Sequence, residues 1–249
     1  MNARINKNYF VALLFVCLSF TYTPNLRSLH PKEKSTTSTA AALNALNQYH
    51  KMEYLALGDS YTIGERVETS DRWSAQLVSI LEKKGKSITT LDIIARTGWT
   101  TAELLEGIQA SGNKKKYSLV SLLIGVNNQY RGQSVDVYRK EFKTLLNTAI
   151  SFASGKPERV FVLSIPDWGV TPHGKGYDRD KVARAIDSFN QVAEEECRHA
   201  GILFINITDL SRQAAYDASL IASDDLHFSG VMYRLWAIKA LPFVEKMLE

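Results

Sequence analysis

Five short apolar runs, separated by helical patterns, restrict the fold of this chain more than any other feature. The runs are Tyr54–Leu57, Ser87–Ala95, Leu119–Ile124, Arg159–Ile165 and Ile202–Ile207. Short apolar runs that alternate with helices are typical of parallel strands covered on both faces. Because crossovers between parallel strands are right-handed, the sequence predicts an α/β fold: a three-layer α/β/α sandwich around a five-stranded parallel sheet.

Amphipathic stretches fill the intervals between these runs. They are Arg72–Lys84, Thr100–Ala110, Val135–Ala153 and Arg179–His199, followed by the last helical stretches Asp209–Asp217 and Gly230–Leu248. Thr100 or Thr101 is a candidate N-cap, and Gly85 marks a helix end. Pro166–Asp178, rich in Gly and Pro, is expected to be an irregular loop. Residues 51–249 contain no repeat or linker, so we expect one domain with a flavodoxin-like sheet.

An apolar segment and a polar segment precede this domain. Tyr9–Phe20 is too short for a comfortable transmembrane helix but suits the apolar core of a signal peptide. No clean small-x-small cleavage site lies near Thr21–Thr23, so residues 1–23 are predicted to be a signal peptide or an N-terminal membrane anchor. Residues 24–50, rich in Ser and Thr, are predicted to be a polar tether. We therefore expect export to a periplasmic, membrane-anchored or extracellular location.

Charge and cysteine content argue against two classes of function. The net charge of +4 is mild and the basic residues are scattered, so the run Lys114–Lys116 indicates a solvated surface rather than a nucleic-acid site. The two cysteines, Cys17 and Cys197, supply neither a disulfide framework nor a cysteine metal site. A nucleic-acid partner is therefore not expected.

Polar residues follow four of the apolar runs. Ser60 follows the first, Gly98 the second and Asn127 the third, and the segment Asp224–His227 follows the fifth. Singly, these residues are explained by a helix cap, a turn glycine, an Asx turn or a surface histidine. However, the carboxyl ends of parallel strands share one edge of a sheet. Gathered there, a hydroxyl, N–H donors and an Asp/His pair are the components of acyl transfer.

This ordered set resembles the SGNH hydrolases, also called the GDSL lipase/esterase family. The blocks that carry the resemblance span about residues 53–249 and are Gly58-Asp59-Ser60, Gly98, Gly125-Val126-Asn127-Asn128 and Asp224-Asp225-Leu226-His227. The resemblance implies an SGNH hydrolase fold for a catalytic domain at residues 51–249. Asn128 departs from the family pattern, which has aspartate there, and we interpret this as a change in loop support. The Gly-x-Ser-x-Gly elbow of α/β-hydrolases is absent.

The resemblance also implies a role for each site residue. Ser60 would be the nucleophile, His227 the base and Asp224 the residue that orients His227, with Asp225 as a rival for that role. The oxyanion hole would be formed by the Ser60 N–H, the Gly98 N–H and the Asn127 side-chain amide. No metal or organic cofactor is required. Asp59 is expected to bond to the backbone of the turn that presents Ser60.

The loops after the strands are expected to determine the substrate. These loops are Tyr61–Asp71, Gln129–Ser134 and Pro166–Asp178, with Tyr130, Arg131 and Trp168 as candidate substrate-binding residues. No long lid or apolar insertion is evident, which favours short-chain acyl or O-acetyl esters of small molecules or glycans. Two alternatives stay open: an acyltransferase on envelope glycans that uses the same acyl-enzyme, and a non-catalytic binding module.

Overall fold

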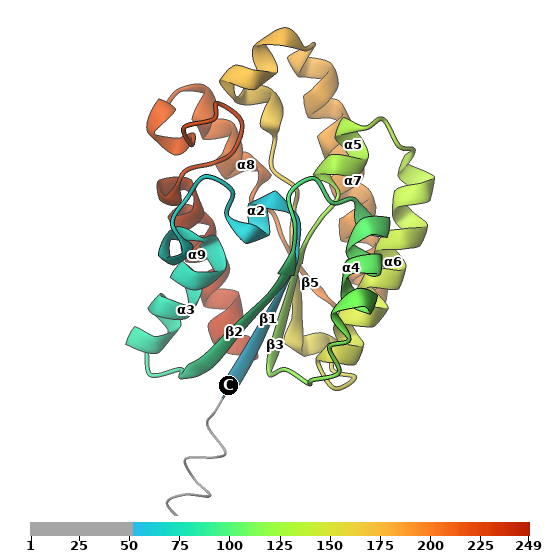
Figure 1. The fold of residues 1–249 in the computed structure, drawn as a ribbon, viewed down its shortest axis with the longest axis vertical. Helices are drawn as coiled ribbons and strands as arrows, with labels where there is room; N and C mark the ends of the chain where they lie inside the picture. Colours follow the sequence, from blue (N-terminus) through green and yellow to red (C-terminus); the bar gives the residue numbers. More distant parts are fainter. Residues whose placement is uncertain (1–51) are drawn as a thin grey trace, which may run out of the picture. The chain divides into compact units, whose positions relative to one another are not determined.

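A five-stranded parallel sheet lies at the centre of the computed structural model, which describes residues 52–249 (Figure 1). The strands are β1 (Met52–Gly58), β2 (Ile88–Ala95), β3 (Leu119–Leu123), β4 (Val160–Leu163) and β5 (Leu203–Ile205). Their order is β2-β1-β3-β4-β5, and every adjacent pair is parallel. The segments predicted at residues 1–23 and 24–50 lie outside the described residues.

Helices cover both faces of the sheet, which confirms the three-layer prediction. Helices α3 (Trp73–Lys83) and α9 (Gly230–Met247) pack together on one face. Helices α4 (Thr101–Ser111), α6 (Val135–Phe152) and α7 (Arg179–Ala200) lie on the other face (Figure 1). Thr100 is the N-cap of α4 and forms a capping box with Glu103, so the cap is Thr100 and not Thr101.

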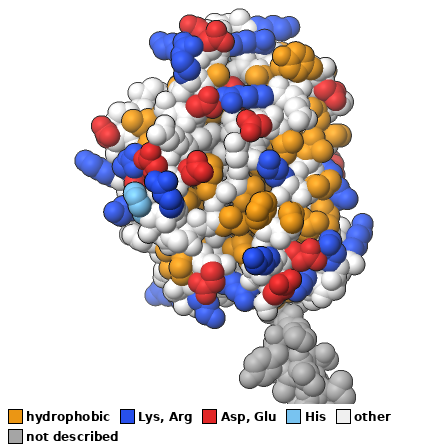
Figure 2. Space-filling model, turned by 180° about the vertical axis from the view of Figure 1, so that it is seen from behind, with side chains coloured by type: hydrophobic (Ala, Val, Ile, Leu, Met, Phe, Trp, Pro, Cys, Tyr) orange, Lys and Arg blue, Asp and Glu red, His pale blue; other side chains and the backbone are white. Residues whose placement is uncertain are grey.

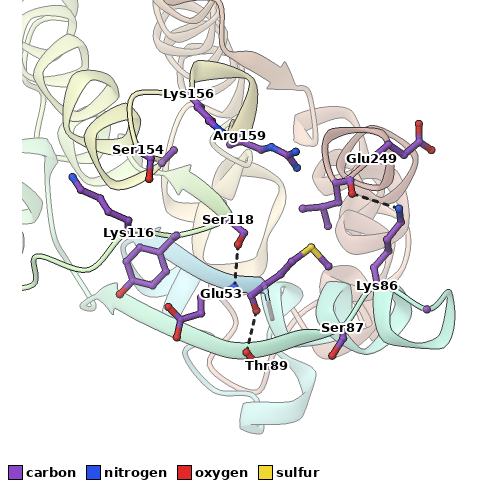
Figure 3. Close-up of a pocket in the computed structure, with 15 residues that line it drawn as sticks. Glu53, Lys86, Ser87, Thr89, Lys116, Ser118, Ser154, Lys156, Arg159 and Glu249 are labelled. Carbon is purple, nitrogen blue, oxygen red and sulfur yellow. Dashed lines mark hydrogen bonds between the residues drawn. The ribbon is translucent and has the colours of Figure 1, made fainter. Parts of the chain in front are cut away.

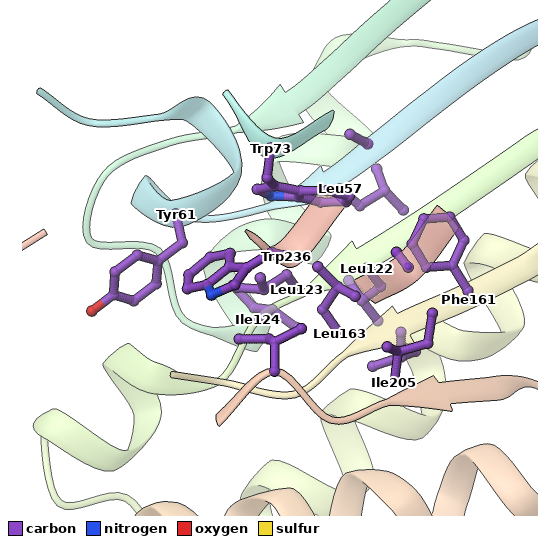
Figure 4. Packing of buried hydrophobic residues seen from close by; sticks show 14 of the residues in the cluster. Leu57, Tyr61, Trp73, Leu122, Leu123, Ile124, Phe161, Leu163, Ile205 and Trp236 are labelled. Atoms are coloured by element: carbon purple, nitrogen blue, oxygen red, sulfur yellow. The ribbon is translucent and has the colours of Figure 1, made fainter. Parts of the chain in front are cut away.

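Large aromatic side chains pack the layer between the sheet and the pair α3 and α9 (Figure 4). Trp73 of α3 meets Phe161 of β4 edge to face, with ring centroids 6.2 Å apart. Trp236 of α9 meets Tyr61 in the same manner, also at 6.2 Å. Since Tyr61 directly follows Ser60, this core supports the turn that carries the serine.

Several short elements differ from the prediction. Helix α5 (Val126–Tyr130) directly follows β3, where the sequence indicated only a turn, because five residues are too few to show helical periodicity. The helix predicted at Asp209–Asp217 is wrong in its second half: α8 (Thr208–Ser211) passes into the 3-10 turn η5 (Arg212–Ala215). The expected loop Pro166–Asp178 contains two 3-10 turns, η3 (Trp168–Val170) and η4 (Pro172–Gly176). The remaining short elements are α2 (Ser60–Ile63), η1 (Thr69–Asp71), η2 (Pro157–Arg159) and η6 (Ala218–Leu220).

The surface carries charges of both signs. On the face in Figure 2, Lys and Arg side chains are interspersed with Asp and Glu side chains. Among residues 52–249, no helix combines the length and the apolar composition needed to cross a membrane.

Candidate active site

Ser60 lies at the carboxyl end of β1, as the first residue of α2. Asp59 caps this short helix: its Oδ1 accepts the Tyr61 N–H at 3.1 Å. A Cβ atom on Gly58 would lie 2.2 Å from Thr62 Oγ1 and 2.4 Å from the Leu123 carbonyl oxygen. Only glycine therefore lets the chain turn this close to β3, and the turn presents Ser60 at the edge of the sheet.

The Asp59 carboxyl is completely buried beneath this turn. Burial disfavours its charged form and raises its pKa to about 7, although the Tyr61 N–H bond acts in the opposite direction. Within residues 52–249, its second oxygen, Oδ2, has no hydrogen-bond partner. The predicted bond from Asp59 to the turn backbone is present, and the strongly shifted pKa is a feature that the sequence did not indicate.

Asp224 and His227 form a hydrogen-bonded pair on the loop before α9, and Arg66 Nε lies 3.7 Å from the Asp224 Oδ2 atom. Asp224 Oδ2 lies 2.6 Å from His227 Nδ1, while Asp224 Oδ1 accepts the backbone N–H groups of Leu226 and His227 at 3.1 and 2.9 Å. Burial by itself raises the pKa of Asp224, but these hydrogen bonds outweigh it and lower the pKa below its ordinary value. The ionised carboxylate therefore holds the Nδ1 proton and leaves Nε2 as the ring acceptor.

Asp225 does not contact the His227 ring in the described part of the chain. Its backbone is left-handed, with φ of 61°, and its carbonyl oxygen accepts the His173 N–H at 2.9 Å. The side chain is exposed. The geometry thus selects Asp224 over Asp225 as the partner of His227.

Tyr61, the residue that follows Ser60, contacts the ring of His227. The Tyr61 ring lies edge to face against the His227 ring, with centroids 5.6 Å apart. In residues 52–249 no hydrogen bond joins the Ser60 hydroxyl to His227, and Ser60 is buried, with 5% of its surface exposed. Such bonds are often long in free enzymes and tighten when substrate binds.

The loop after β2 is tied to helix α5. Asn127 Nδ2 donates to the Trp99 carbonyl at 2.9 Å, and Arg131 Nη2 donates to the Gly98 carbonyl at 2.6 Å. Gly98 has a φ of 85°, which favours glycine. Across the described residues, neither the Gly98 N–H nor the Ser60 N–H donates a hydrogen bond, and Asn127 keeps a second amide hydrogen. These donors are the ones that the oxyanion prediction requires.

Asn128 links α5 to the start of α4. It is fully buried, and its Oδ1 accepts the Thr101 N–H at 3.1 Å. Its Nδ2 donates to Thr101 Oγ1 at 2.6 Å and to Gln133 Oε1 at 2.8 Å, and Thr101 Oγ1 in turn donates to Glu141. An aspartate could accept from the backbone but could not donate to Gln133. With an amide at position 128, the acidic group of this network is supplied by Glu141 of α6, through its bond from Thr101 Oγ1.

The candidate substrate-binding residues separate into two groups. Tyr130 and Trp168 lie together, with ring centroids 5.1 Å apart. Arg131 instead contacts Gly98 and Glu103, so its guanidinium supports the loop that carries Gly98. The sequence did not indicate that Tyr177 joins Tyr130 and Trp168, since contacts between separate loops leave no periodic signal.

A hollow lies at the opposite edge of the sheet, near the amino ends of the strands (Figure 3). This cavity of about 860 Å³ is lined by basic, acidic and hydroxyl side chains that include Lys86, Lys116, Arg159, Glu53 and Glu249. None of the predicted site residues lines it. In open α/β sheets, ligands bind outside the carboxyl ends of the strands, so the Ser60 edge is the candidate active site.

No group of three or more His, Cys, Asp or Glu side chains in residues 52–249 is arranged to hold a metal ion.

Several solved structures have a fold similar to that of this chain. Crystal structures similar to the chain include TesA (17% identity, TM-score 0.62, covering 78% of this chain and 99% of TesA). A lipase/acylhydrolase from Enterococcus faecalis is 18% identical with a TM-score of 0.61, and the match covers 78% of this chain and 96% of that protein. An acetylxylan esterase, Axe2, from Geobacillus stearothermophilus is also 18% identical with a TM-score of 0.61, and the match covers 78% of this chain and 94% of Axe2. At these identities the likeness shows the fold alone. No curated protein matches the sequence.

A family model decides the assignment. The model of the GDSL-like Lipase/Acylhydrolase family matches residues 56–235, which include every block of the predicted site. The chain therefore belongs to the GDSL-like lipase/acylhydrolase family, whose hydrolase fold its sheet and helices reproduce.

Proposed function

We propose that the protein is a serine esterase that hydrolyses carboxylic esters through an acyl-Ser60 intermediate. The observation that carries the proposal is the 2.6 Å contact between Asp224 Oδ2 and His227 Nδ1, beside Tyr61 and the serine that precedes it. This pair supplies an oriented imidazole whose Nε2 forms no hydrogen bond among residues 52–249. A serine hydroxyl needs such an acceptor to become a nucleophile.

The reaction has two half-steps. Ser60 Oγ attacks the ester carbonyl carbon while His227 Nε2 takes the serine proton. The negative charge on the carbonyl oxygen is met by the Ser60 N–H, the Gly98 N–H and the Asn127 amide. The intermediate collapses, the bond to the alcohol oxygen breaks, and His227 returns the proton to that oxygen.

The second half-step restores the enzyme. A water molecule gives its proton to His227 and attacks the acyl-Ser60 carbonyl. The bond to Ser60 Oγ then breaks, His227 reprotonates the serine, and the carboxylic acid leaves.

Short acyl groups fit this site best. The loops around Ser60 contain short turns (α2, η3 and η4), and no long apolar insertion stands among the described residues to sequester an extended chain. Among proteins of the same fold, Axe2 is an acetylxylan esterase. We therefore infer acetyl or other short-chain esters as substrates, including O-acetyl esters.

Hydrolysis of a p-nitrophenyl ester series from acetyl to palmitoyl tests the proposal. Wild type should hydrolyse the acetyl ester fastest, and Ser60→Ala should release nitrophenol no faster than buffer. Equal rates for the two proteins would reject the role of Ser60. Counting acetic acid against acetyl groups transferred to an added sugar alcohol separates hydrolysis from acyl transfer.

A further inference from the structure

Four aromatic side chains form one continuous cluster above the carboxyl edge of the sheet. Tyr130, Trp168, His173 and Tyr177, which we call the aromatic wall, have ring centroids between 4.8 and 6.3 Å apart. The Trp168 and Tyr177 rings are perpendicular, and the Tyr130 and Tyr177 hydroxyl oxygens lie 3.0 Å apart. These contacts hold the rings in defined orientations, which lowers the entropic cost of binding a ligand.

The aromatic wall is anchored to both sides of the candidate active site. Tyr130 belongs to α5, the same short helix that carries Asn127. Trp168 Nε1 donates to Gln129 Oε1 of α5 at 2.8 Å. On the other side, the His173 N–H donates to the Asp225 carbonyl at 2.9 Å, on the loop of Asp224 and His227. The aromatic wall therefore connects helix α5, which carries Asn127, to the loop that carries Asp224 and His227.

Exposure distinguishes the support of the wall from its contact surface. Trp168 is 3% exposed, whereas Tyr130 and Tyr177 are 47% and 46% exposed. His173 is also exposed. A buried indole thus supports two half-exposed phenol rings, and aromatic groups grouped in the open beside a candidate active site mark a binding surface.

The chemistry of this surface selects one class of ligand. Its faces are apolar, but its rim carries two phenol hydroxyls and an imidazole. An extended acyl chain would need an enclosing apolar groove, and it gains nothing from a polar rim. A pyranose ring presents a face of C–H groups to an aromatic ring and hydroxyls around its edge, so it matches both parts of the wall.

We propose that the aromatic wall binds the alcohol part of the ester and that this alcohol is a pyranose sugar. The sugar would then be the group released when Ser60 is acylated. This inference rests on the proposed esterase function and adds the class of alcohol. Tyr130 and Tyr177 stack on the sugar, and Trp168 positions Tyr130 and Tyr177.

Kinetics on two acetyl esters test the inference. The esters are glucose pentaacetate and ethyl acetate, followed by acid release, since a nitrophenyl ester could itself stack on the wall. Tyr130→Ala and Tyr177→Ala should raise KM for the sugar ester about tenfold, in the range expected for one lost aromatic contact. On ethyl acetate, kcat/KM should stay within about twofold of wild type. Tyr216→Ala is the matched control, because Tyr216 is 94% exposed and lies outside the wall.

Binding provides a readout that does not depend on turnover. Calorimetric titration of Ser60→Ala with the acetylated sugar should show binding, and adding Tyr177→Ala should weaken it about tenfold, while adding Tyr216→Ala should not. Equal binding by these variants, or equal kinetic losses on both esters, would overturn the inference. Wall-dependent binding by a wild type that hydrolyses neither ester would instead reject the esterase function and leave the subsite standing.

Discussion

The carboxylate of Asp224 lies 2.6 Å from His227 Nδ1 and simultaneously accepts the His227 backbone N–H at 2.9 Å. One side chain thus fixes both the ring and the chain segment that bears it. The spacing of three residues brings this about, because Asp224 begins the turn in which His227 lies. The pair is the part of the candidate site that the structure shows fully assembled.

Asp224→Asn should lower kcat sharply while leaving the fold intact. An amide at this position would favour the wrong imidazole tautomer, which costs about 10⁴-fold in the analogous substitution of a serine protease. Asp225→Asn is the matched control, since asparagine tolerates the left-handed backbone of Asp225. Steady-state kinetics on p-nitrophenyl acetate should show little change for the control. Comparable losses in both variants would contradict the assignment of Asp224.

Asn127→Ala should reduce kcat by about 10²–10³-fold, the cost of removing one oxyanion donor, with a small change in KM. The substitution also removes the 2.9 Å bond to the Trp99 carbonyl. A thermal melt must therefore accompany the kinetics. A rise in KM at constant kcat would show that Asn127 binds the ground state and not the transition state.

Asn128→Asp, which restores the residue typical of the family, should destabilise this protein. The new carboxylate would lose the donor to Gln133 and would face Glu141 across the Thr101 hydroxyl. We expect a loss of about 1–3 kcal/mol in the free energy of unfolding, measured with urea. Because Glu141→Gln removes the competing charge, the double variant should recover part of the loss. If the losses of unfolding free energy in Asn128→Asp and Glu141→Gln simply add in the double variant, this coupling is contradicted.

Asp59 should make the stability of the protein depend on pH between about 4 and 7. Its folded pKa is about 7 and its ordinary value 3.8, so in this window the folded state keeps a proton that the unfolded state has lost. The free energy of unfolding therefore falls as pH rises, by at most about 4 kcal/mol, and this contribution becomes constant above the folded pKa.

Asp59→Asn should abolish this contribution, because an amide does not titrate. Urea unfolding of wild type and variant across the same pH range measures it. The relevant quantity is the difference in slope, since the variant carries its own constant cost. Parallel curves would show that Asp59 does not titrate in this window.

The sequence predicted the sheet, the large helices and the ordered site blocks because each has a local signal. Apolar runs mark the strands, and the spacing of Thr100 and Glu103 marks a cap that the structure confirms. Helix α5 was missed because five residues after a strand look like a turn. Its N-cap, Gly125, has a φ of 128° and sits against the Tyr138 ring, which is a tertiary constraint.

Contacts between loops could not be predicted. The aromatic wall unites α5 with η3, η4 and Tyr177, and the acidic partner of the Asn128 network comes from α6. The choice of Asp224 over Asp225, by contrast, followed from the resemblance, and among the described residues Asp224 is the carboxylate that contacts the His227 ring.

Trapping the acyl-enzyme tests the central claim most directly. Wild type mixed with p-nitrophenyl acetate and quenched in acid within the first turnovers should gain the mass of one acetyl group. Peptide mapping should place that group on Ser60, and Ser60→Ala should gain nothing. An acetyl group on another residue would contradict the account. So would turnover without acylated Ser60 at any quench time, both in wild type and in Asp224→Asn, which should deacylate slowly.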